Sequence, residues 1–426
     1  MTASDTHRAI ETVWRIEWPR LIAGLTRIVR DVGLAEELAQ DALVAALEQW
    51  PESGIPDSPG AWLMGTAKHR AIDLIRHHSM VDRKHAEIGR DLDEQRERIV
   101  ASLEEAMDDP IGDDLLRLMF IACHPILSPE ARVALTLRLL GGLSTEEIAR
   151  AFLTAESTVA QRIVRAKRTL AEADVPFEVP RAELSSRLAA VLDVIYLIFN
   201  EGYAATTGEE WIRPSLCEDA LRLGRILAEL MPNESEVHGL VALMEIQASR
   251  LRARTTAAGQ PILLLDQDRG RWDHLLIRRG LAALDRAEKL SARRGRYTLQ
   301  AAIAACHARA RTASETDWIR IAALYEALAQ LEPTPVIELN RTMAIAMAFG
   351  PETALPLVDE LAADDALKNY HLLPSVRGDL LSKLGRFDEA RAEFERAASL
   401  TKNVRERDLL LERAAALTGP SRPAER

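Results

Sequence analysis

The chain has 426 residues and a mass of 47.2 kDa, more than one hydrophobic core usually organises, which predicts two or three domains. Hydrophobic residues make up 47% and charged residues 28%, which excludes a mainly disordered chain. The net charge is −11, so any contact with nucleic acid must come from a local basic patch. Aromatic residues make up only 4%, while Ala, Leu, Arg and Glu are frequent throughout, which predicts an all-α fold.

The cysteines and the apolar runs indicate the compartment. Cys123, Cys217 and Cys306 are far apart and none belongs to a C-x-x-C pair, which predicts neither a disulfide framework nor a zinc site. The first 15 residues lack the apolar core of a signal peptide, and no apolar run reaches the ~18 residues of a membrane span. We therefore expect a cytoplasmic protein with no membrane contact.

The first predicted domain covers residues 1–80. Its three helical patterns lie at residues 9–31, 34–50 and 61–78. A stretch rich in Pro, Gly and Ser at residues 51–60 predicts a loop between the last two helices. Residues 81–110 are charged and weakly periodic, which is typical of a linker.

The second predicted domain covers residues 111–173 and ends in two closely spaced helices. Ser144 and Glu147 fit a capping box, S-x-x-E, which predicts that a helix begins there and runs to about residue 152. A short turn follows, and Val159 and Ile163 supply the apolar stripe of a helix at residues 157–170. This layout predicts a helix-turn-helix.

The second of these two helices is basic. Residues 157–170 include Arg162, Arg165, Lys167 and Arg168 but no acidic residue. These cations could pair with phosphates, and Gln161 and Arg162 could reach base edges in the major groove. The alternative is a solvated basic surface, but the capped preceding helix and the short turn favour DNA binding.

The third predicted domain covers residues 181–417, after a segment with two prolines at residues 174–180. Helical patterns separated by short breaks indicate an α-solenoid. Its clearest repeat, at residues 370–401, contains Leu384-Gly-Arg-Phe-Asp-Glu-Ala390 followed by Phe394 and Ala397. This pattern resembles the tetratricopeptide (TPR) repeat, in which small residues let paired helices approach and an aromatic side chain fills the gap.

Three motifs stand out in the first domain: Ala35-Glu-Glu-Leu-Ala-Gln-Asp41, Ala61-Trp-Leu63 and Arg70-Ala-Ile-Asp-Leu-Ile-Arg76. They resemble regions 2.2 to 2.4 of bacterial sigma-70 family factors of the extracytoplasmic-function (ECF) group. In the second domain, Leu143-Ser-Thr-Glu-Glu-Ile-Ala149 and the run from Ser157 to Arg168 resemble region 4 of the same family. The two resemblances occur in the expected order over about the first 175 residues.

The resemblance implies binding to core RNA polymerase and to promoter DNA. The helix at residues 34–50 would dock on the β′ clamp, and region 4 would meet the β flap. The implied clamp contacts are Leu38, Gln40, Asp41, Leu43 and Leu47. The apolar residues of this helix could equally be internal core, and for Leu38 and Leu47 core packing is at least as plausible.

The resemblance also implies two DNA-binding sets. The loop at residues 51–60 would capture an unstacked −10 base, and the next helix would hold the melted strand through Lys68, His69, Arg70 and Arg76. The −35 element would meet Thr158, Gln161, Arg162, Arg165, Lys167 and Arg168. Many ECF factors have Asn in place of His69, and a Lys/Arg-Ser pair in place of Ala160-Gln161. The family's preferred −10 and −35 sequences therefore cannot be transferred to this chain.

The third domain resembles the TPR-like extension of one ECF subgroup, at Phe199-Asn-Glu-Gly-Tyr203 and Leu265-Asp-Gln-Asp-Arg269. It implies regulation through a protein partner or an intramolecular contact. The main rival function is a TPR scaffold that has lost promoter activity, and a helix-turn-helix repressor is a weaker one.

A catalytic function ranks third. Asp266, Asp268, Arg269, Asp273 and His274 could form a metal or anion site, but a solvated loop with local ion pairs is the favoured interpretation. The sequence contains no nucleotide-binding glycine loop, convincing nucleophile triad or H-E-x-x-H motif. We therefore expect no enzyme activity, cofactor or metal.

Overall fold

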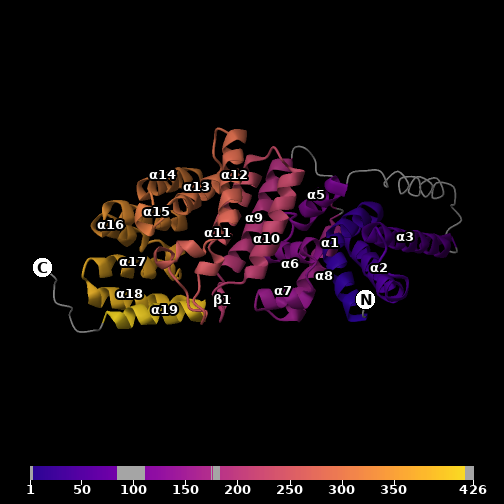
Figure 1. Cartoon of the computed structure of the whole chain (residues 1–426), viewed down its shortest axis with the longest axis horizontal. Helices are drawn as coiled ribbons and strands as arrows, with labels where there is room; N and C mark the ends of the chain where they lie inside the picture. Colours follow the sequence, from indigo (N-terminus) through magenta and orange to yellow (C-terminus); the bar gives the residue numbers. More distant parts are fainter. Residues whose placement is uncertain (1–2, 84–110, 174, 176–182, 418–426) are drawn as a thin grey trace. The chain divides into compact units, whose positions relative to one another are not determined.

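The computed structural model describes residues 3–83, 111–173, 175 and 183–417 (Figure 1). These residues are almost entirely helical, which confirms the predicted all-α fold. Packing divides the chain into two compact units, Met1–Ile195 (unit 1) and Tyr196–Arg426 (unit 2). Among the described residues, no helix is both long and apolar enough to cross a membrane.

Three long helices begin unit 1: α1 (Ala3–Val29), α2 (Val32–Ser53) and α3 (Pro59–Arg83). Each packs against the other two. Their apolar stripes bury Trp18, Ile22, Leu38, Trp50 and Leu63. This burial, rather than helix propensity, supplies most of the stability of the three helices.

The loop between α2 and α3 is shorter than the sequence suggests. Pro51 lies in the last turn of α2, and the helix continues past it to Ser53. Because proline has no N–H, this costs the helix one backbone hydrogen bond. Gly54 then ends the helix at φ 84°, and its N–H donates to the carbonyl of Trp50 at 3.0 Å. Pro59 is the first residue of α3, so residues 54–58 connect the two helices.

The second half of unit 1 contains the predicted helix-turn-helix. Its elements are α5 (Ile111–Ala122), α6 (Pro129–Thr136), the π-helical η1 (Leu137–Gly141), α7 (Thr145–Ala151) and α8 (Glu156–Glu172). The capping box is present: Ser144 Oγ accepts from the Glu147 N–H at 3.1 Å, and Glu147 Oε2 accepts from the Ser144 N–H at 2.7 Å. Val159 and Ile163 are buried, and α8 packs on α6 and α7.

The boundary between the units falls within α9 (Leu184–Tyr203). The helices of unit 2 that follow are α10 (Pro214–Leu230), α11 (Ser235–Ala248), α12 (His274–Leu290), α13 (Arg296–Arg309), α14 (Trp318–Leu331), α15 (Pro335–Phe349), α16 (Pro351–Leu361), α17 (Leu372–Lys383), α18 (Phe387–Leu400) and α19 (Val404–Ala416). Single turns of 3-10 helix lie at η3 (Leu251–Ala253), η4 (Leu264–Asp266), η5 (Arg269–Arg271), η6 (Ala313–Glu315) and η7 (Asp365–Leu367). Helices adjacent in the chain pack together, as Figure 1 shows for α17, α18 and α19.

The repeat recognised in the sequence has the expected packing. Phe394 of α18 is 1% exposed, and a Cβ added at Gly378 of α17 would lie 3.0 Å from its ring. Gly385 connects the two helices at φ 74°, a backbone conformation that residues with a Cβ rarely adopt. Small residues and one aromatic side chain thus let α17 and α18 pack closely.

Two strands of two residues link distant parts of unit 2. β1 (Thr207–Gly208) pairs in parallel with β2 (Lys402–Asn403), so that Thr207 faces Lys402 and Gly208 faces Asn403. The buried Asn403 side chain donates to the carbonyls of Ala205 at 3.0 Å and Glu210 at 2.8 Å. The strand just before α19 is therefore bonded to the segment between α9 and α10.

Candidate nucleic-acid and polymerase interface

Helix α8 has one buried and one exposed face. Its buried side chains are Val159, Ile163, Ala166 and Leu170. Of the six residues predicted to bind −35 DNA, Gln161, Arg165 and Arg168 are exposed, while Thr158, Arg162 and Lys167 are half-buried. The predicted DNA-binding residues therefore lie mostly outside the apolar stripe.

The exposed cations of α8 have few partners. Arg168 pairs with Glu172 at 3.4 Å, and both side chains are 70% exposed, so this ion pair is weak. The side chains of Gln161 and Arg165 have no hydrogen bond or ion pair to another described residue. Such side chains can pair with phosphates and base edges without first breaking an internal contact.

Lys167 differs from the other cations of α8, because its ammonium pairs with Glu36 of α2. Glu36 is 4% exposed, and its Oε1 accepts from Arg138 of η1 at 2.6 Å. Gln40 also donates to Glu36 Oε1, at 3.2 Å. We call Glu36, Arg138 and Lys167 the Glu36 cluster, which joins the first three helices to the helix-turn-helix within unit 1.

The motif from Ala35 to Asp41 contains Glu36 but does not by itself predict this role. One signal was present: Glu36 follows Val32 and Ala35 on the face of α2 that is otherwise apolar. A carboxylate on a buried face needs cationic partners. The partners could not be identified from the sequence, since Arg138 and Lys167 are 102 and 131 residues away.

Replacing Glu36 with Gln should lower the free energy of unfolding of unit 1 by about 3 kcal/mol, because an amide cannot neutralise two mostly buried cations. Native-state hydrogen exchange of the α2 amides measures this effect separately from unit 2. Glu37→Gln is the control, since Glu37 is adjacent and exposed. Equal protection of the α2 amides in the two variants would contradict a stabilising role for Glu36.

Of the five predicted polymerase contacts on α2, one is buried in the core and four are at least partly exposed. Leu38 is 2% exposed and packs in the core, so it supports α2 and offers no surface for a partner in this arrangement. Leu43 is half-buried and Leu47 is 36% exposed. Gln40 and Asp41 are exposed, and they give α2 a polar surface beside these two leucines.

The predicted −10 contacts lie on α3, next to that surface. Arg70 Nη1 lies 3.1 Å from Asp41 Oδ2, which brings together one residue from each predicted set. Lys68 is half-buried; burial and then Arg27 lower its pKa. His69 is exposed and its Nδ1 lies 2.7 Å from the carbonyl of Gly65. The side chain of Arg76 lies outside the described residues.

The segment from Asp266 to His274 forms capped turns. Asp268 accepts from the Gly270 N–H at 2.9 Å, and Asp273 caps α12 through the N–H groups of Leu275 and Leu276. Arg269 points inward and donates to carbonyls of other turns. Asp268 and Asp273 therefore accept hydrogen bonds from backbone N–H groups in or next to the segment, while Arg269 is bonded to carbonyls near the end of α13.

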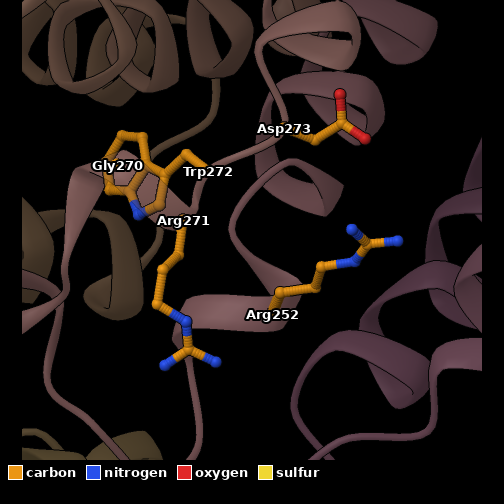
Figure 2. A pocket seen from close by; sticks show the side chains of 5 residues that line it. All are labelled: Arg252, Gly270, Arg271, Trp272 and Asp273. Carbon is orange, nitrogen blue, oxygen red and sulfur yellow. The ribbon is translucent and has the colours of Figure 1, made fainter.

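An open cavity of about 530 Å³ adjoins this segment, lined by Arg252, Gly270, Arg271, Trp272 and Asp273. Figure 2 shows the guanidinium groups of Arg252 and Arg271 pointing in different directions. The described residues contain no group of three His, Cys, Asp or Glu side chains that could hold a metal ion.

Three family models match successive parts of the chain. Sigma-70 region 2 matches residues 17–80, and Sigma-70 region 4 matches residues 117–170. A family of unknown function (DUF6596) matches residues 187–288. The two sigma regions thus coincide with the helices that carry the predicted polymerase and DNA contacts.

Similar proteins extend this result. An uncharacterized protein of Rhizobium meliloti (strain 1021) is 44% identical over 393 residues, 91% of each chain. The probable ECF RNA polymerase sigma factor SigI of Mycobacterium tuberculosis (strain ATCC 25618 / H37Rv) is 28% identical over 177 residues, 42% of this chain and 59% of SigI. The ECF RNA polymerase sigma factor SigK of Mycobacterium ulcerans (strain Agy99) is 28% identical over 155 residues, 35% of this chain and 78% of SigK. The chain therefore belongs to the sigma-70 family, as an ECF-type member whose two sigma regions are followed by a long helical extension.

Proposed function

We propose that this protein directs core RNA polymerase to promoters by docking α2 on the polymerase clamp, holding the melted −10 strand with α3 and reading the −35 element with α8. One observation carries the proposal: α8 follows a capped helix and a short turn, and exposes Gln161, Arg165 and Arg168 on the face opposite its core. These features support a recognition helix, because such a helix enters the major groove with its exposed side chains toward the bases and phosphates.

The −10 function rests on charge and on loop shape. The short loop at residues 54–58 precedes α3, on which His69 is exposed and Arg70 is 40% exposed. Cations here would contact phosphates of a single strand, while the loop would receive an extruded base. The region has few exposed aromatic side chains for stacking, so capture would depend on the loop.

The proposed polymerase contact uses the polar surface of α2. Gln40, Asp41, Leu43 and Leu47 form its candidate surface, with two polar side chains next to two partly exposed leucines. Such a mixture is typical of interfaces between proteins that associate and separate. The proposal leaves Leu38 as a core residue of α2.

Binding of DNA by all the cations of α8 would require a change within unit 1. Lys167 pairs with Glu36, so its ammonium must leave that carboxylate before it can meet a phosphate. Gln40, a proposed polymerase contact, bonds to the same carboxylate. We propose that docking on the polymerase and release of Lys167 are coupled through Glu36.

We propose that unit 2 regulates the sigma regions by binding a partner. The proposal rests on the size of unit 2, a helical extension longer than both sigma regions together. Stacked helix pairs commonly present extended binding surfaces for proteins. A scaffold without promoter activity remains the rival function.

In vitro transcription with purified core RNA polymerase tests the proposed function directly. Full-length protein and core polymerase are incubated with fragmented genomic DNA, and the 5′ ends of the transcripts are sequenced. We expect start sites that are absent with core polymerase alone and that share two upstream sequence elements.

Two other results would contradict the proposal. Binding to double-stranded DNA without new start sites, and without affinity for core polymerase, would indicate a helix-turn-helix repressor. Absence of binding to either DNA or polymerase would indicate a scaffold that has lost sigma activity.

A further inference from the structure

A cavity of about 480 Å³ lies inside unit 2 and has no role in the proposed promoter function. Side chains from α9, α11, α13, α14 and α15 line it, together with Leu264 of η4 and Arg250, which follows α11. Its size falls within the range of small-molecule sites, about 300–1,000 Å³. It is thus a candidate ligand site built by five helices.

Arg250 is the one charged side chain of this lining. The residue is 7% exposed, and its Nε has no hydrogen-bond partner among the described residues. No acidic side chain of the described part of the chain lines the cavity. Glu245, the nearest acidic residue along the chain, already pairs with Arg225 at 2.9 Å and Arg279 at 3.3 Å.

The surroundings of Arg250 increase the positive potential. Arg254 and Arg269 lie close enough for the charge of Arg250 to lower the pKa of each, after the larger effect of burial. The Arg250 guanidinium lies 5.6 Å from the ring centre of Tyr203 and 5.8 Å from that of Trp272. These aromatic rings compensate only part of the cost of burying a cation without a counter-ion.

The other polar groups of the lining are uncharged. Burial, with Arg250 and Arg269, lowers the pKa of His307 to about 3, so this imidazole is neutral at physiological pH. His307 Nδ1 is buried and has no partner among the described residues. Tyr196 donates to Gln300 at 3.0 Å, which fixes one amide at the cavity wall.

The rest of the lining is mostly aliphatic and includes Leu243, Ile303, Leu328 and Ile337. An inorganic ion would leave these side chains without contacts. An organic anion would place its charged group near the guanidinium and its apolar body against the aliphatic side chains. The lining therefore favours an amphipathic ligand with one negative end.

We propose that this cavity binds a small organic anion, whose carboxylate or phosphate pairs with Arg250 and whose apolar body packs against the aliphatic wall. The unpaired buried cation is explained if the ligand supplies the missing negative charge. Burial of a charge is tolerated when a partner of opposite sign is present. Unit 2 would then carry an effector site in addition to any protein-binding surface.

Binding is measured on the full-length protein by calorimetry and by thermal shift, with benzoate, hexanoate and phenyl phosphate as probes. Benzamide is the uncharged control, and sodium chloride is added to equal ionic strength. We expect saturable binding of at least one anion and a higher melting temperature in its presence. Benzoate against phenyl phosphate distinguishes a carboxylate site from a phosphate site.

Arg250→Gln should weaken binding of that anion at least about tenfold, because it removes the charged partner. Without ligand, this variant should melt no lower than the parent protein, since an uncompensated buried charge is removed. Arg252→Gln is the matched control, because Arg252 is an exposed arginine that lines the other cavity.

A second variant tests the cavity even if Arg250→Gln fails to fold. Asn340 is exposed and lines the same cavity, so Asn340→Asp adds a negative charge while leaving the core intact. It should weaken binding of the anion and leave the response to benzamide unchanged. The proposal is overturned if no probe binds, or if binding is equal in the parent, Arg250→Gln and Asn340→Asp proteins. Polymerase and DNA are absent, so the result does not depend on the proposed promoter function.

Discussion

Replacing both Arg162 and Arg165 with Ala is expected to weaken promoter binding about 100-fold near physiological salt and to leave the affinity for core polymerase unchanged. The Arg165 side chain is exposed and has no partner in the described ranges of the chain, and Arg162 is half-buried one turn before it on α8. Removing one phosphate-binding side chain should reduce the slope of log affinity against log salt by about 0.9. Gel-shift titrations at several salt concentrations, with a pull-down of core polymerase, measure both affinities.

Arg396→Ala is the matched control for this variant. Arg396 is a similarly exposed arginine on α18, 4.0 Å from Glu393, and removing it also deletes a positive charge from an exposed helix face. Promoter affinity equal in the Arg162/Arg165 double variant and the control would show that α8 is not the recognition helix. A parallel decrease in polymerase binding would indicate damage to unit 1 instead.

Combining Gln40→Ala with Asp41→Arg should reduce the affinity for core polymerase at least about tenfold. Both residues are exposed on α2, so the fold should tolerate the changes. In the parent protein Asp41 pairs with Arg70. Asp41→Arg replaces this pair with two positive charges and reverses the charge at the proposed interface. Competition with a labelled sigma factor for core polymerase gives the affinity.

Two controls separate docking from internal structure. Glu395→Arg makes the same charge reversal on the exposed face of α18 and should have no effect. Adding Arg70→Asp to Asp41→Arg restores an internal ion pair with the charges exchanged. Recovery of polymerase binding in that charge-swapped protein would mean that Asp41 acts through Arg70, which would contradict a direct contact.

Local features of this protein follow from its sequence. Ser144 and Glu147 predict the start of α7, since a capping box depends only on residues three positions apart. The apolar spacing of Val159 and Ile163 predicts the buried face of α8. The Leu384–Ala397 pattern predicts a close helix pair, although not that Gly378 is the residue against Phe394. Each of these signals is confined to one helix or two adjacent ones.

Contacts between distant residues could not be predicted in this way. Glu36 meets Arg138 and Lys167 only because α2, η1 and α8 fold together, and a single sequence carries no record of that pairing. The sequence around Arg250 gives no sign that its side chain is buried, because the five helices that line the cavity come from distant parts of the chain. The predicted roles of the α2, α3 and α8 side chains remain predictions, because they depend on partners that only binding experiments supply.

The hydrogen bonds of Asn403 affect how the end of unit 2 unfolds locally. In a linear array of helix pairs, the last helix contacts only one neighbour, so it frays at a small fraction of the global free energy of unfolding. Here Asn403 caps α19 through the Glu406 N–H and also donates to the carbonyls of Ala205 and Glu210, near the start of the unit. Detaching β2 and α19 together therefore also breaks hydrogen bonds to the segment after α9. We therefore expect the first and last parts of unit 2 to unfold together, so that removing its last repeat should also destabilise the segment after α9.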